Sequence, residues 1–193
     1  KYLSGDLKWA DLFEPHNEHR VFLTRLYLLS LFKINGGLWP LTFSMKVQAL
    51  VPSLTCAMIV HYYVNKAKTI SKTVLLAIFV SFALPIGYES LLWNIEVHWY
   101  LLIFFSVLSF YVLQWGGQST SSFFWAQVFA ILSYLSIASG FITSFIVGFF
   151  YLVKALISSQ KVWRIRFFLF SGLSLLVTYS LYSLIPHLPR HDS

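Results

Sequence analysis

Long apolar runs separated by short polar segments make up most of this 193-residue chain. Four runs, the second of them short, cover residues 41–64, 73–88, 97–115 and 167–185. Each predicts a transmembrane helix, which needs about 20 apolar residues to cross about 30 Å of hydrocarbon. A fifth run, 123–157, would form a straight helix about 50 Å long, too long for one bilayer. There we expect two helices that meet near Ser139-Gly140, which makes about six membrane helices.

The first forty residues follow a different pattern. Lys8–Glu14 predicts a short helix, which Pro15 ends because proline disfavours the α conformation of the residue before it. Residues 20–34 are apolar but interrupted by three basic side chains, and they are too few to cross a bilayer. They predict an amphipathic helix in the membrane interface. The expected division is therefore an outer loop over residues 1–40 and a transmembrane bundle over 41–193.

Composition supports this class. Hydrophobic residues make up 58% of the chain and charged residues only 11%, whereas about a quarter of a typical soluble chain is charged. The apolar excess must face lipid or other helices. The predicted fold is all-α, a polytopic helical membrane protein with membrane lipids as its surroundings. The single cysteine, Cys56, lies in an apolar run and is interpreted as a small packing residue.

The net charge of +7 does not indicate nucleic-acid binding, because basic residues gather in short loops between apolar runs. One such loop is Asn65–Lys72, and a second is marked by Lys161, Arg164 and Arg166. The positive-inside rule places both loops in the cytoplasm. All seven acids and five of the six histidines then fall on the opposite side. This predicts that the polar chemistry belongs to the outer face, with residues 1–40 in the periplasm.

The densest polar cluster is His16-Asn17-Glu18-His19-Arg20. A helix would stack two histidines three residues apart on one face. With Glu18 or Asp11 they could bind a divalent metal, although zinc sites need three or four protein ligands, and no cofactor is expected. As an anion site, Arg20 offers a planar fork for phosphate, and His16, Asn17 and His19 donate hydrogen bonds. A solvated helix cap at the interface is the third interpretation.

A second candidate group, around Glu89 and Trp93, lies at the outer end of the second and third apolar runs. With Glu96 it could line a sugar-binding cleft, in which an aromatic face stacks on the sugar ring. The alternative is an ordinary membrane interface, because tryptophan is enriched at that depth in any case.

The run from Asp11 to Leu26, which contains His16-Asn17-Glu18-His19-Arg20, resembles a motif in a group of bacterial inner-membrane proteins related to the GT-C glycosyltransferases. Two further stretches resemble later motifs of that group, Glu89–Glu96 and Ala138–Ser144. Ser90 replaces the usual asparagine of the second motif, and Asn94-Ile95-Glu96 replaces Gly-Phe-Gln. The first motif is the specific one.

The resemblance implies a GT-C-like enzyme that transfers a sugar from a polyprenyl-phosphate carrier at the periplasmic face of the bacterial inner membrane. In that family the catalytic carboxylate usually follows the first span, which would lie upstream of Lys1. We therefore expect this chain to be a segment of a longer protein. Glu18 and Asp11 are the candidate catalytic carboxylates within it, and His16, Asn17, His19, Arg20, Glu89 and Trp93 are the candidate substrate-binding residues.

Two other classes stay open. A transporter or lipid-binding protein could use the same outer cleft without catalysis. A transport path should bring polar residues to the middle of the membrane, and this chain offers few beyond Lys46, Gln48 and Gln127. A purely structural subunit would give no reason for the one-sided acids and histidines.

Overall fold

A computed structural model describes residues 7–14, 21–39, 41–66, 71–83, 97–116 and 119–185. Within these ranges the chain is helical and contains no strand. The elements in chain order are η1 (Trp9–Phe13), α1 (Phe22–Ile34), α2 (Leu41–Lys66), α3 (Lys72–Ala83), α5 (Val97–Trp115), α6 (Thr120–Ser136), η3 (Ala138–Gly140), α7 (Phe141–Ile157) and α8 (Lys161–Ser183). The all-α prediction is confirmed for this part of the chain.

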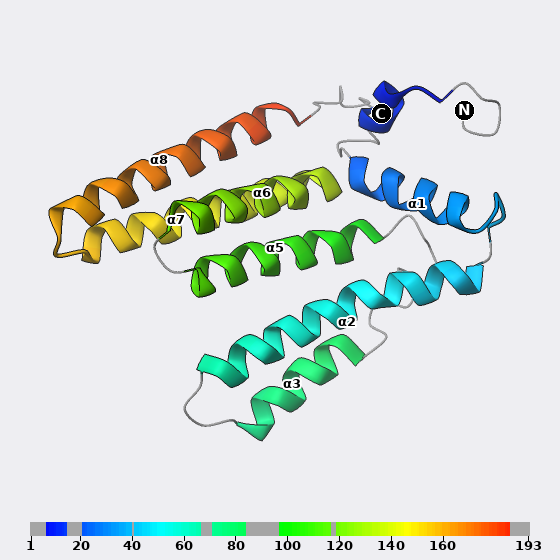
Figure 1. The fold of residues 1–193 in the computed structure, drawn as a ribbon, viewed down its shortest axis with the longest axis horizontal. Coiled ribbons are helices and arrows are strands. Elements are labelled where there is room, and N and C mark those ends of the chain that lie inside the picture. The colour runs from blue at the N-terminus through cyan, green and yellow to red at the C-terminus, as the bar shows by residue number, and fades with distance from the viewer. Residues whose placement is uncertain are drawn as a thin grey trace, which may run out of the picture.

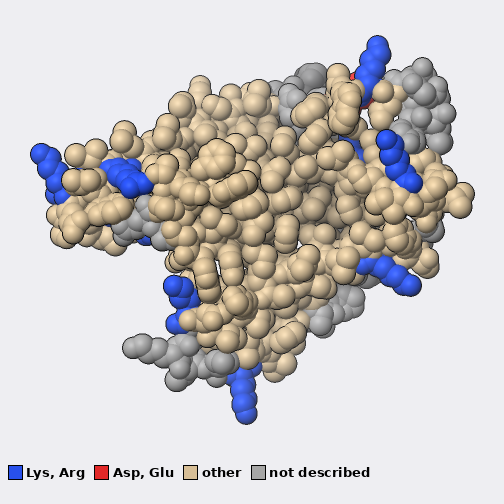
Figure 2. Space-filling model, viewed as in Figure 1, with Lys and Arg blue, Asp and Glu red and all other residues tan. Residues whose placement is uncertain are grey.

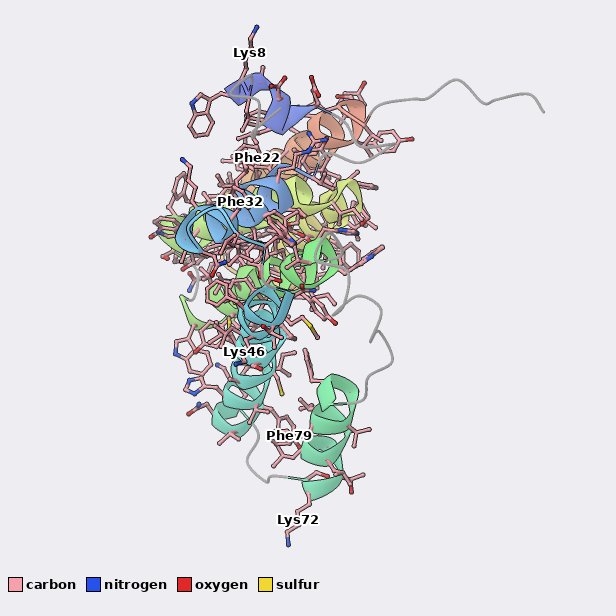
Figure 3. The ribbon with its side chains drawn as sticks, turned by 90° about the vertical axis from the view of Figure 1, so that its right-hand side faces the viewer. Lys8, Phe22, Phe32, Lys46, Lys72 and Phe79 are labelled. Carbon is pink, nitrogen blue, oxygen red and sulfur yellow. The ribbon has the colours of Figure 1, made fainter. Side chains whose placement is uncertain are left out.

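The helices are arranged side by side along the long axis of the molecule (Figure 1). α5 pairs with α6 and α7 pairs with α8 as antiparallel hairpins, and α6 also packs on α7. α2 lies against α5, and α3 packs on α2 at the edge (Figures 1 and 3). α1 lies at the opposite end from the α7–α8 turn, in contact with η1, α5 and α6. The molecule is thus a four-helix bundle, α5–α8, with α1, α2 and α3 outside it.

Four helical segments of the described chain are long and apolar enough to cross a membrane: Thr42–Lys66, Val97–Trp115, Ala138–Ile157 and Lys161–Ser183. Their length and composition support the expectation of a helical membrane protein. The count of about six is not confirmed by the described residues, because α6 has 17 residues and α3 has 12. At 1.5 Å per residue α6 is about 26 Å long, close to the thickness of the hydrocarbon.

The last span begins earlier than the sequence pattern predicted. Lys161, Arg164 and Arg166 were expected in a loop, and this was wrong, because α8 starts at Lys161 with Gln160 as its N-cap. Lysine and arginine are good helix formers, so nothing in the sequence stops the helix before its charged residues. The connection from α7 is only Ser158–Gln160.

The break predicted near Ser139-Gly140 is confirmed and has a steric reason. α6 ends at Ser136, and the short η3 turns the chain back into α7. A Cβ atom on Gly140 would lie 2.3 Å from the carbonyl carbon of Ser133 and 2.3 Å from the backbone nitrogen of Tyr134. Only glycine permits this approach of two backbones, so η3 folds directly back onto the last turns of α6.

An aromatic core fills the bundle near its basic end. Phe123 of α6 stacks on Phe170 of α8, with ring centroids 4.3 Å apart. Tyr151 of α7 meets both rings edge-on, at 5.5 and 5.2 Å. Since these three side chains come from three helices and are buried, they bind α6, α7 and α8 into one unit.

Hydroxyl groups join α5, α6 and α7 in the middle of the bundle. The hydroxyl of Ser106 lies 2.7 Å from that of Thr143 and 3.1 Å from that of Ser133. Ser133 and Thr143 lie 3.2 Å apart and are themselves buried. Each hydroxyl therefore finds a partner on another helix where lipid offers none.

A second polar set joins α6, α7 and α8. The amide nitrogen of Gln127 donates to the hydroxyl of Ser174, and the hydroxyl of Ser144 donates to the carbonyl oxygen of the Gln127 side chain at 3.0 Å. All three side chains are buried. The amide of Gln127 thus has a donor and an acceptor contact inside the protein.

Candidate polar sites at the two ends of the bundle

The sequence motifs fall largely outside the described residues. His16, Asn17, Glu18, His19 and Arg20, and also Glu89 and Trp93, lie in the undescribed segments 15–20 and 84–96. Asp11 is described, at the centre of η1. These candidate roles therefore stay predictions, while the surroundings of the first motif are visible on both sides of it.

Arg25 of α1 holds η1 in place. Its guanidinium group donates to the backbone carbonyl oxygens of Asp11 at 2.8 Å and Leu12 at 3.3 Å, and also to that of Glu14. These carbonyls lie at the end of a short helix, and that of Asp11 also accepts the backbone N–H of Glu14 at 3.3 Å. A cation near a helix C-terminus is also favoured by the helix dipole.

The carboxylate of Asp11 has a structural contact. One of its oxygens accepts a hydrogen bond from the backbone N–H of Lys8 at 2.7 Å, as in a capping box, where an acidic side chain near the helix start reaches back to the capping residue. This carboxylate therefore stabilises the start of η1.

Aromatic stacking joins the same two elements. The ring of Phe13 at the end of η1 stacks on that of Phe22 at the start of α1, with centroids 4.2 Å apart and planes 17° from parallel. Leu12 and Val21 are buried beside them. Glu14 and Val21, which flank segment 15–20, are thus anchored by neighbouring contacts of one small assembly, η1 and α1.

α1 also carries two hydroxyl groups without a hydrogen-bond partner among the described residues, those of Thr24 and Tyr27. Thr24 is fully buried. Burial raises the pKa of the Tyr27 phenol to about 12, because the charged phenolate loses solvation there. The packed face of α1 is therefore partly polar. Its location in a membrane interface stays a prediction.

No group of three or more histidine, cysteine or acidic side chains that could hold a metal ion occurs within the described ranges. The two histidines of the motif lie outside them. A divalent metal at that motif therefore stays a hypothesis from the sequence.

The opposite end of the bundle carries a cluster that the sequence analysis missed. Trp115 at the end of α5 stacks on Tyr111 at 5.0 Å, and His61 of α2 lies 5.3 Å from it. The ammonium group of Lys66 lies 5.6 Å from the centroid of the Trp115 ring. The sequence did contain a sign of this cluster, because Lys66 and Trp115 each end an apolar run on the side of the membrane that carries the basic loops.

A second cation-aromatic group occupies the end of the α7–α8 hairpin. Arg166 lies 5.2 Å from the Trp163 ring, and it donates to the hydroxyl of Thr120 at the start of α6. The ammonium group of Lys154 lies 4.5 Å from the Phe150 ring and 5.9 Å from that of Phe167. Figure 2 shows basic side chains at both ends of the molecule and a broad middle without them.

The two ends differ in their acids. Asp11 and Glu14 are the acids that the described ranges contain, and both belong to η1 or its end. The other end carries Lys66, Lys72, Lys154, Lys161, Arg164 and Arg166. The described chain is thus polarised along its axis, with a mixed-charge end and a purely basic end.

Two hollows lie at or near the basic end. One, about 460 Å³, is lined at the α7–α8 turn by Lys154, Ile157, Ser158, Ser159, Gln160, Trp163 and Phe167. The other, about 300 Å³, lies between α2 and α5 and is lined by Met58, Ile59, Tyr62, Val107, Phe110, Tyr111 and Gln114. The first is polar with aromatic walls, and the second is largely apolar.

Comparison of the chain with protein-family models, with curated proteins and with solved structures gave no match.

Proposed function

We propose that this chain is part of a membrane glycosyltransferase, GT-C-like, that takes a sugar from a polyprenyl-phosphate carrier at the end of the bundle where η1 and α1 lie. His16, Asn17, His19 and Arg20 bind the donor phosphate. Glu89 and Trp93 face the same site, and the end itself is periplasmic in a bacterial inner membrane.

The observation that carries this proposal is the anchoring of the described residues on both sides of the polar motif. Arg25 and the Phe13–Phe22 stack fix the chain on both sides of segment 15–20 against one end of a membrane bundle. A loop that binds a charged headgroup benefits from such anchoring, because less conformational entropy is lost when the ligand binds. The anchored elements contact α5 and α6 through α1.

The roles of the two carboxylates can now be separated. Asp11 accepts a backbone hydrogen bond within η1, so one of its carboxylate oxygens is already engaged in the local structure. Glu18 is therefore the better candidate to accept a proton from an acceptor hydroxyl. In the proposal Asp11 stabilises η1, and Glu18 acts on the substrate.

The bundle interior argues against the transporter alternative. A transport path needs polar groups in mid-membrane that are available to the substrate. The hydroxyls of Ser106, Ser133 and Thr143 bind one another, and Gln127 is bound to Ser144 and Ser174. These polar groups hold helices together, which favours a surface site.

The test is binding of polyprenyl phosphate to the purified chain in detergent, measured for the wild type, Arg20→Ala and Lys33→Ala. Lys33 is an exposed cation near the end of α1 and provides the matched control. Loss of a charge-assisted phosphate contact should weaken binding about tenfold or more in Arg20→Ala. Lys33→Ala should bind as the wild type does. No saturable binding by the folded wild type, or equal losses in both variants, would contradict the phosphate role.

A further inference from the structure

The polar hollow at the turn between α7 and α8 lies at the end of the bundle opposite η1 and α1. In Figure 1 this hairpin extends beyond the neighbouring ends of α5 and α6, so its tip stands free of the bundle. The hollow there measures about 460 Å³, within the range of small-molecule sites. It is large enough for a lipid headgroup.

One wall of the hollow carries a cation. Lys154, on the last turn of α7, is half-buried, and its ammonium group lies over the faces of Phe150 and Phe167. Every acid within the described ranges lies at the other end of the molecule. Its ammonium group therefore keeps its hydrogen-bond donors for a ligand, since aromatic faces attract the charge without accepting all three hydrogens.

The opposite wall consists of hydrogen-bonding groups. Ser158, Ser159 and Gln160 form the turn and line the hollow. The side chain of Gln160 does not cap α8, so N–H groups of the first turn of this 23-residue helix have no side-chain partner there. Together with Lys154, these groups suit an anion with several oxygen atoms.

The rest of the lining is apolar or aromatic. Ile157, Trp163 and Phe167 line the same hollow as the polar turn, and Ile157 is exposed. A free anion gains nothing from contact with these apolar side chains, whereas the glycerol backbone and first methylenes of a lipid would pack on them. Basic pockets between transmembrane helices are known sites for anionic headgroups.

We propose that the α7–α8 turn is a binding site for a phosphate group, with Lys154 as its cation and a diacyl phospholipid as the molecule that carries it. The site is independent of the proposed donor site, because it lies at the other end of the bundle and uses none of its residues. In the orientation that the sequence favours, it faces the cytoplasmic leaflet.

The experiment is native mass spectrometry of the full chain in detergent, titrated separately with dioleoylphosphatidylglycerol and with dioleoylglycerol, which lacks phosphate. Lys154→Met keeps an apolar stem and removes the charge. Lys72→Met, on α3 at the same end, controls for general surface charge, because Lys72 is exposed and does not line the hollow. Phosphatidylglycerol should bind saturably, about tenfold more weakly to Lys154→Met, and unchanged to Lys72→Met.

Three results would overturn the site: equal binding of the two lipids, equal losses in both variants, or no saturable binding. Equilibrium dialysis with labelled inorganic phosphate separates the two sources of the anion. Binding of phosphate that depends on Lys154 and matches the affinity for lipid supports the phosphate contact but rejects the lipid as its carrier. Weaker or no binding of phosphate supports the lipid.

A measurement on the wild type avoids dependence on the folding of a variant. Phosphatidylglycerol should slow acylation of the Lys154 amine by a water-soluble active ester several-fold relative to dioleoylglycerol, while Lys72 reacts at the same rate with both. Peptide mapping by mass spectrometry gives the two rates. Unchanged reactivity of Lys154 at saturating lipid would reject the contact.

Discussion

α7 and α3 are both apolar helices of fewer than 18 residues, yet α7 is packed inside the bundle and α3 lies at the edge of the molecule. α7 buries Thr143, Ser144, Val147, Gly148, Tyr151 and Ala155, which form a stripe at helical spacing. α3 packs on α2 alone among its stronger contacts, and none of its described side chains is buried. Figure 3 shows it standing at the edge of the molecule, with Lys72 at its outer end.

The difference lies in how closely a partner helix approaches rather than in hydrophobicity. On α7 a Cβ at Gly148 would lie 3.0 Å from the Cβ of Ser174, so α8 approaches closely at this position. Within α3 the sequence contains no glycine, and its large residues are half-buried or exposed, as with Leu76 at 63%. Inside a membrane a large apolar residue packs on lipid as well as on protein, and small residues mark helix contacts.

The strongest test of this contrast compares Phe123→Ala with Phe79→Ala. Phe123 is buried against Phe170, and its truncation leaves a cavity that should cost about 3–5 kcal/mol. Phe79 on α3 is 56% exposed, so its truncation should cost less than about 1 kcal/mol. Reversible unfolding in mixed detergent micelles gives both values. Similar losses would mean that α3 is packed as tightly as the bundle.

Gly140→Ala should destabilise the protein by about 1–3 kcal/mol, because the added methyl group would overlap the backbone at Ser133. Gly172→Ala on α8 is the matched control, since a Cβ there meets nothing within 4 Å. The control should leave the free energy of unfolding unchanged or raise it by up to about 1 kcal/mol. An unaffected Gly140→Ala variant would contradict the close approach of η3 to the end of α6.

The polar contacts of the bundle can be measured by a double-mutant cycle of Gln127→Leu and Ser174→Ala. The two side chains bind each other in the buried interior. We expect a coupling energy of about 0.6–1.7 kcal/mol, the range found for interhelical hydrogen bonds in membranes. The same cycle on Ser81 of exposed α3 with Gln127 should give no coupling. A zero value for Gln127 and Ser174 would contradict a stabilising contact between these two side chains.

The smallest expected effect concerns Tyr27. Its pKa is raised to about 12 in the folded chain from an ordinary value of about 10. The folded state thus favours the protonated phenol, and this contribution is complete below pH 10 and lost as the pH rises from about 10 to 12. Tyr27→Phe should reduce the alkaline loss of stability, as measured by unfolding between pH 9 and 11.5. An identical pH profile would show that the phenol is solvated.

The sequence alone predicted the helical membrane class, the bounds of α5, and the break at Ser139-Gly140. These features follow from local information, since apolar run length and glycine position determine them without knowledge of partners. The sequence analysis placed the start of the last helix at residue 167 rather than at Lys161. The length of an apolar run marks where a helix becomes apolar and not where its hydrogen bonding begins. The motif at 16–20 is visible in the sequence, but its side-chain geometry lies outside the described residues.

Tertiary structure decided which residues meet. No local pattern shows that Arg25 holds the carbonyl groups of Asp11, or that Lys154 and Gln160 line one hollow. Such pairs depend on how separate helices pack, and in a chain that is apolar on nearly every face the periodicity does not reveal the packed face. The sequence determined that helices are long and apolar enough to cross a membrane and where they break, and packing between helices determined the rest.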